Sequence, residues 1–141
     1  MFSSSIGDTV NLASRLEGLG KLYGVSIIIS GGVHDKVKEH VHTRLLDVVA
    51  VKGKSKAGRI FELIKRKHLA TPKDVDNASL FQRAFESYLR REFTAAIELF
   101  ETYLKAFPTD KATKHHIESC QNFLVTPPPP NWNGVAKLEE K

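Results

Sequence analysis

The chain has 141 residues, 41% hydrophobic and 26% charged, a balance typical of a folded protein rather than a disordered one. The sequence has no apolar run near the roughly 20 residues that cross a bilayer, and its N-terminus does not read as a secretory signal. With Cys120 as the single cysteine, no internal disulfide can form, so we expect a cytoplasmic setting. The net charge of +5 comes without an aromatic platform, which argues against nucleic-acid binding.

The first half of the chain predicts, in order, a helix, a strand, a second helix and two further strands. Apolar residues at helical spacing favour a helix over 8–22, with glycines at its end. A glycine-containing loop between the last two strands is typical of a hairpin. The remaining elements are a strand at 25–29, a helix from 30 to about 40, a strand at 43–51, the loop at 52–58 and a strand at 59–64.

The second half predicts only helices. Residues 65–78 are charged and lack periodicity, so we interpret them as a linker. Aromatic and small residues then recur at helical spacing through two helices, and Pro108 ends the second. A third helix is expected over roughly 110–124, followed by a stiff proline run and by Trp132, which we expect to dock back on the helices. The expected division is therefore 1–64, the linker 65–78, and 79–141.

One helix and one loop carry the functional signal. Residues 7–15 read G-D-T-V-N-L-A-S-R, and the i, i+4 spacing places Asn11 and Arg15 on one helix face, suited to ribose or phosphate. The stretch resembles the signature helix of class III nucleotidyl cyclases, G-D/N-x-V-N-x-A-x-R. Residues 51–54 read V-K-G-K, like a loop of the same enzymes. The resemblance covers residues 2–64 and implies part of a ferredoxin-like α+β cyclase domain.

The resemblance also implies a reaction, in which a ribose 3′-hydroxyl attacks the α-phosphate and displaces pyrophosphate. Arg15 would stabilise the charge that builds on the α-phosphoryl oxygens, and Asn11 would orient the ribose. Lys52 would hold the terminal phosphates. Ser4 occupies the purine-selecting position and favours ATP only weakly over GTP. The implied full-length protein is a bacterial adenylate cyclase that makes cyclic AMP for signal transduction.

The metal-binding part of that site is missing from the pattern. Class III cyclases bind two Mg²⁺ or Mn²⁺ ions through two aspartates, the first in a D-I-x-G-F context. None of the aspartates at 8, 35, 47, 74, 76 and 110 lies in such a context. We therefore expect no metal on this chain's own residues and little activity from the chain alone. A complementary cyclase half would supply the aspartates, and the shared sites of the family imply a homodimer for the full-length protein. A shortened chain, a split gene or a late-assigned start codon is the simpler explanation of the pattern.

The helical half resembles one tetratricopeptide repeat, with small and aromatic residues at the spacing of that repeat. This resemblance implies a protein partner or a dimer-stabilising role. The alternative for the whole chain is a non-enzymatic interaction module with a vestigial cyclase remnant. Neighbouring His115 and His116 are not expected to bind metal, because adjacent helix positions point about 100° apart and the sequence shows no further ligand.

Overall fold

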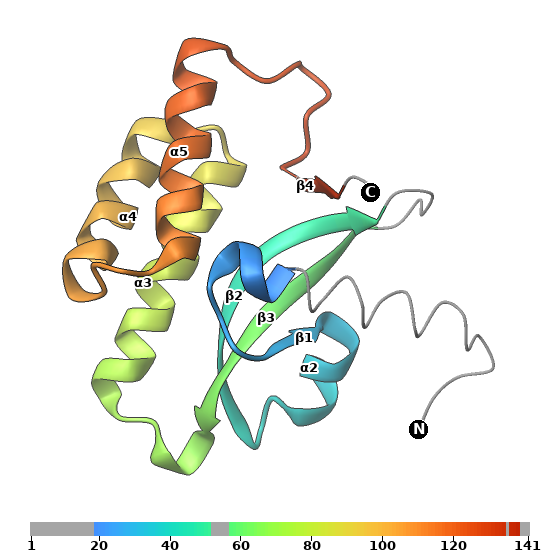
Figure 1. The fold of residues 1–141 in the computed structure, drawn as a ribbon, viewed down its shortest axis with the longest axis vertical. Coiled ribbons are helices and arrows are strands. Elements are labelled where there is room, and N and C mark those ends of the chain that lie inside the picture. The colour runs from blue at the N-terminus through green and yellow to red at the C-terminus, as the bar shows by residue number, and fades with distance from the viewer. Residues whose placement is uncertain (1–18, 52–56, 135, 139–141) are drawn as a thin grey trace.

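The computed structural model describes residues 19–51, 57–134 and 136–138 of the chain (Figure 1). The fold is mixed α+β, with a small sheet beside a group of three long helices. Among the described helices, none combines the length and apolarity needed to cross a membrane. The elements are β1 (Ile28–Ser30), α2 (Gly31–Val37), β2 (Val41–Val51), β3 (Ala57–Arg66), a 3-10 turn (Lys67–Leu69), α3 (Pro72–Leu89), α4 (Phe93–Ala106), α5 (Lys111–Val125) and β4 (Ala136–Leu138).

The sheet has the strand order β1-β3-β2-β4. β2 and β3 form the predicted antiparallel hairpin, and β1 pairs antiparallel with β3. The strand expected at 25–29 begins later, at Ile28, because Gly24 and the residues after it still form the turn that ends the preceding helix. β4 was not expected: the chain returns after the proline run and pairs parallel with β2.

The expected linker at 65–78 is structured along most of its length. It contains the end of β3, the 3-10 turn and the first part of α3. α3 starts early because Thr71 and Asp74 form a capping box, each side chain accepting from the other residue's backbone N–H. Pro72 stands at the first helical position, where its fixed φ favours a helix and its missing N–H costs nothing.

The sheet and the helices share one hydrophobic core. The aromatic residues predicted for the inner helix faces are buried, among them Phe81, Phe85 and Phe100, and they pack in one cluster with Leu46 and Ile60 of the sheet. The hydrophobic core therefore extends across the expected boundary between residues 64 and 79.

The proline-rich tail docks on the helices as expected. Trp132 packs edge-on against Tyr88, 5.3 Å between ring centroids, and contacts Phe93 and Phe123. Arg91 holds the tail in place, because its guanidinium donates to the backbone carbonyls of Pro128, Pro129, Pro130 and Trp132.

Candidate functional site at the junction of sheet and helices

The four residues predicted to bind nucleotide, Ser4, Asn11, Arg15 and Lys52, lie outside the described residues. Their roles remain predictions. The structure does describe the residues that flank them in the chain. These are the end of the predicted signature helix at 19–23, and the strands β2 and β3 on either side of residues 52–56.

The end of the predicted signature helix is buried and contacts α5 of the helical half. Leu19 and Tyr23 are buried, and Gly24 ends the helix with a positive φ of 68°. The Val25 N–H donates to the carbonyl of Gly20 at 3.0 Å, the bond expected at such a helix end. A Cβ at Gly24 would lie 2.9 Å from the Lys111 side chain of α5, so glycine is needed for both backbone angle and space.

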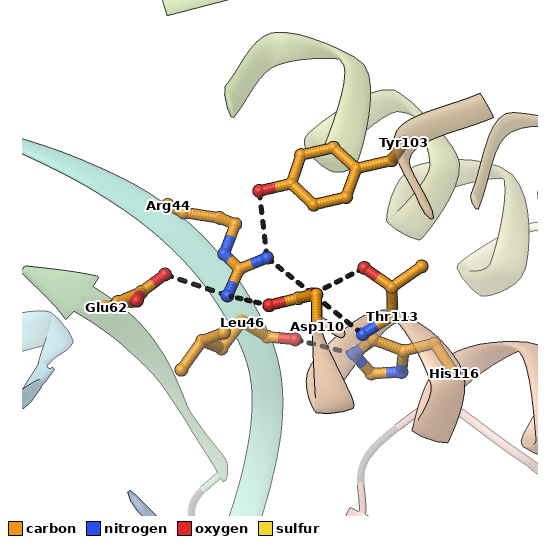
Figure 2. Close-up of polar contacts among 7 residues, drawn as sticks. All are labelled: Arg44, Leu46, Glu62, Tyr103, Asp110, Thr113 and His116. Atoms are coloured by element: carbon orange, nitrogen blue, oxygen red, sulfur yellow. Dashed lines mark hydrogen bonds and ion pairs between the residues drawn. The ribbon is translucent and has the colours of Figure 1, made fainter. Parts of the chain in front are cut away.

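Arg44 is the centre of a buried charged network between the sheet and the helices (Figure 2). Its side chain on β2 is only 2% exposed. The guanidinium donates to both carboxylate oxygens of Asp110, at 2.9 and 3.2 Å, and to the Tyr103 hydroxyl at 3.0 Å. The guanidinium also forms an ion pair with Glu62 on β3, with 2.8 Å between nitrogen and oxygen. The guanidinium carbon Cζ lies 4.6 Å from the centroid of the Phe81 ring.

The two carboxylates that pair with Arg44 have pKa values shifted in opposite directions. Burial raises the pKa of Asp110, but the hydrogen bond and the charge of Arg44 outweigh it, so the pKa lies below its usual range. For Glu62 the burial effect is larger than the attraction of Arg44, and its pKa is raised. The bidentate Arg44–Asp110 pair joins β2 to the N-cap of α5 through two charge-assisted hydrogen bonds.

A second polar cluster lies beside this network, where β2 bulges. The β2–β3 register shifts between Leu45 and Asp47, so strict alternation of side chains is lost there. Leu46 and Asp47, which alternation would place on opposite faces, are 0% and 3% exposed. Asp47 accepts a hydrogen bond from the Tyr23 hydroxyl, and Nε2 of His116 on α5 lies 2.7 Å from the carbonyl oxygen of Leu46.

Sequence reasoning did not identify either cluster. Arg44 and Asp47 stand within the apolar run T-R-L-L-D-V-V of a predicted strand, and charged residues in such a run signal buried partners. The partners Tyr23, Asp110 and His116 are distant in the sequence, so spacing could not identify them.

An open groove runs between α2, α3 and the strands β2 and β3, with a volume of about 690 Å³. Its floor includes Phe61, on which the His34 ring stacks with 3.7 Å between centroids. Both cationic and anionic side chains line it, including Lys38, Arg83 and Glu86. This mixture of charges does not define one class of ligand.

Three relatives are informative, and all are named adenylate cyclase. The terminal-differentiation-specific adenylate cyclase of Dictyostelium discoideum is 32% identical over 132 residues, covering 89% of this chain. Adenylate cyclase 1 of Rhizobium meliloti (strain 1021) is 46% identical over 61 residues, and the adenylate cyclase of Anabaena cylindrica is 47% identical over 64 residues; each match covers 43% of the chain. No family model matches the chain, and no solved structure matches it significantly.

The chain is thus related in sequence to proteins named adenylate cyclase. It spans only 6% of the Dictyostelium relative, 9% of the Rhizobium relative and 13% of the Anabaena relative. The Dictyostelium match, at 89% of the chain, includes much of the helical half as well. The relationship is therefore not confined to the segment with the nucleotide-binding pattern.

Proposed function

We propose that this chain carries the nucleotide-orienting part of a class III adenylate cyclase site, which converts ATP into cyclic AMP and pyrophosphate. The observation that carries the proposal is the agreement between the pattern around Asn11 and Arg15 and the three relatives named adenylate cyclase. Arg15 stabilises charge on the α-phosphate, Asn11 orients the ribose, Lys52 binds the terminal phosphates and Ser4 contacts the purine. A preorganised donor of this kind contributes roughly 10²–10³-fold to kcat.

None of the described aspartates lies in the D-I-x-G-F context of the two-metal site, and three of them already have partners within the fold. Asp110 is bound by Arg44 and Thr113, and Asp74 by Lys65 and the Thr71 backbone. Asp47 is buried and accepts from Tyr23. We therefore assign the two catalytic Mg²⁺ or Mn²⁺ ions to aspartates supplied by another polypeptide segment, in a complementary cyclase half or in a homodimer of the full-length protein.

The helical half is proposed as a tetratricopeptide-like extension that stabilises this assembly. Its support is the small and aromatic spacing, together with three helices that bury their aromatic faces against the sheet. Since those faces are used internally, a partner would be bound by their outer surfaces.

Complementation tests the enzyme proposal. The chain is mixed with an adenylate cyclase catalytic domain whose asparagine, arginine and lysine set is mutated while its aspartates are intact, and cyclic AMP is measured. We expect activity only from the mixture, with ATP preferred to GTP, and a fall of at least about 100-fold with Arg15→Ala. Arg90→Ala is the matched control, because Arg90 is an exposed residue paired with Glu92.

Absence of cyclic AMP at every mixing ratio, from a chain shown to be folded, would reject the enzyme proposal. That result would favour the alternative, a non-enzymatic interaction module. Full activity from the Arg15→Ala chain would instead reject the assigned role of Arg15.

A further inference from the structure

Three metal-ligating side chains meet where the bulge of β2 faces α5. Asp47, His115 and His116 each offer one ligand atom, and these atoms lie within 4.8 Å of one another. Among the described residues, this is the one group of three or more such side chains. The sequence had argued against metal at the two histidines because a third ligand was missing, and the bulge supplies that ligand from 68 residues away, as Asp47.

The hydrogen bond of His116 leaves its other nitrogen available to a metal. A backbone carbonyl can only accept, so Nε2 of His116 carries the proton that it donates to Leu46 at 2.7 Å. Nδ1 of the neutral ring then keeps its lone pair. Histidine ligands in metal sites commonly donate their second N–H to a carbonyl in this way, which fixes tautomer and ring orientation.

Asp47 is held in a similar manner. Its carboxylate accepts from the Tyr23 hydroxyl and from the backbone N–H of Val48, at 2.8 Å for the latter. A carboxylate has about four lone-pair sites, so it can still bind a cation. The structure gives Asp47 no ion pair with the lysines and arginines that it describes, although the side chain is 3% exposed. A buried carboxylate without a cation is costly, and a bound metal would offset that cost.

Both imidazoles lie beside Asp47 and beside each other. The rings are 5.5 Å apart between centroids, and the His115 ring packs edge-on against Tyr23 at 5.4 Å. Each ring has a nitrogen within 4.8 Å of a carboxylate oxygen of Asp47.

We propose that Asp47, His115 and His116 bind one Zn²⁺ ion, which joins the bulge of β2 to α5. Two imidazoles and one carboxylate form a set that Zn²⁺ takes in proteins with a fourth position open, whereas Mg²⁺ and Ca²⁺ prefer oxygen ligands. Ligand atoms around tetrahedral Zn²⁺ are about 3.3 Å apart, so these ligand atoms approach one another by up to about 1.5 Å on binding. The proposal does not depend on the proposed nucleotide site.

Metal titration tests this site without any enzyme assay. The full chain is stripped of metal and titrated with Zn²⁺ alone in competition with a chromogenic chelator. We expect one Zn²⁺ per chain, a higher melting temperature with Zn²⁺, and tetrahedral visible bands when Co²⁺ replaces it. Asp47→Asn and His115→Ala should each weaken binding by more than tenfold. Tyr23→Phe, which removes a hydrogen bond to the carboxylate, should weaken it by about 10–100-fold.

The control is His68→Ala, which removes an exposed histidine from the 3-10 turn and should leave the affinity unchanged. The decision rests on Asp47 and His115, because His116 is in the core and its replacement can prevent folding. Failure of the folded chain to bind stoichiometric Zn²⁺ overturns the proposal. Unchanged affinity in either the Asp47→Asn or the His115→Ala variant overturns it as well.

Discussion

Arg44 shows how one buried side chain couples the two halves of the chain. Its two terminal nitrogens contact the carboxylate of Asp110 at the N-cap of α5, the carboxylate of Glu62 on β3 and the phenol of Tyr103 on α4 (Figure 2). Its buried Nε–H has no hydrogen-bond partner among the described residues. Such a network adds little over a well-packed apolar core while it is complete, but removing one partner leaves uncompensated buried charges. The cost of breaking it should therefore be large.

We predict that Arg44→Met lowers the free energy of unfolding by about 3–5 kcal/mol, because Asp110 and Glu62 then lose their buried counter-charge. Urea unfolding at neutral pH measures the change. Arg90→Met is the control: the Arg90 and Glu92 side chains are 58% and 54% exposed, and such a surface pair contributes at most about 1 kcal/mol. Similar losses in the two variants would contradict the coupling role of Arg44.

At the scale of elements, the start of α3 depends on local capping. In the folded chain, hydrogen bonds from the Lys65 ammonium and the Thr71 backbone N–H lower the pKa of Asp74 to about 2. The ordinary value is 3.8, so the folded state favours the ionised carboxylate. Its stabilisation is fully present above pH 3.8 and is lost as the pH falls toward 2.

We therefore predict that Asp74→Asn is less stable than the parent chain at pH 7, and that the difference closes between about pH 4 and pH 2. The free energy of unfolding is measured for both chains across that range. Asp76→Asn, at an exposed position early in the same helix, controls for the loss of one negative charge. A difference that stays constant down to pH 2 would show that the Asp74 carboxylate does not act through its charge.

At the scale of the whole molecule, the shared core predicts a single cooperative unfolding transition. Leu46 and Ile60 of the sheet belong to the same buried cluster as Phe81 and Phe100 of the helices. Trp132, the only tryptophan, reports on the helical side because it packs against Tyr88 and its neighbours. The tryptophan fluorescence and the hydrogen exchange of β2 and β3 amides should therefore yield the same free energy of unfolding. Two separate transitions would instead support independent domains at the expected boundary.

Local sequence patterns were sufficient to predict most of the helices and strands. The β2–β3 hairpin, the three long helices and the docked Trp132 follow from side-chain periodicity and turn residues, which act over a few positions. The capping box at Thr71 and Asp74 was also readable in the sequence, and overlooking it produced the supposed linker at 65–78.

The sequence by itself determined the mixed α+β class and the resemblance to cyclases around Asn11 and Arg15, because both rest on residues close together in the chain. Only the tertiary structure decided that β4 returns to β2, that Arg44 meets Asp110, and that Asp47 meets the two histidines of α5. A one-residue bulge in β2 determines the last of these, since it turns Asp47 inward against the period of the strand. Such contacts depend on register and on packing between distant segments, which no local pattern encodes.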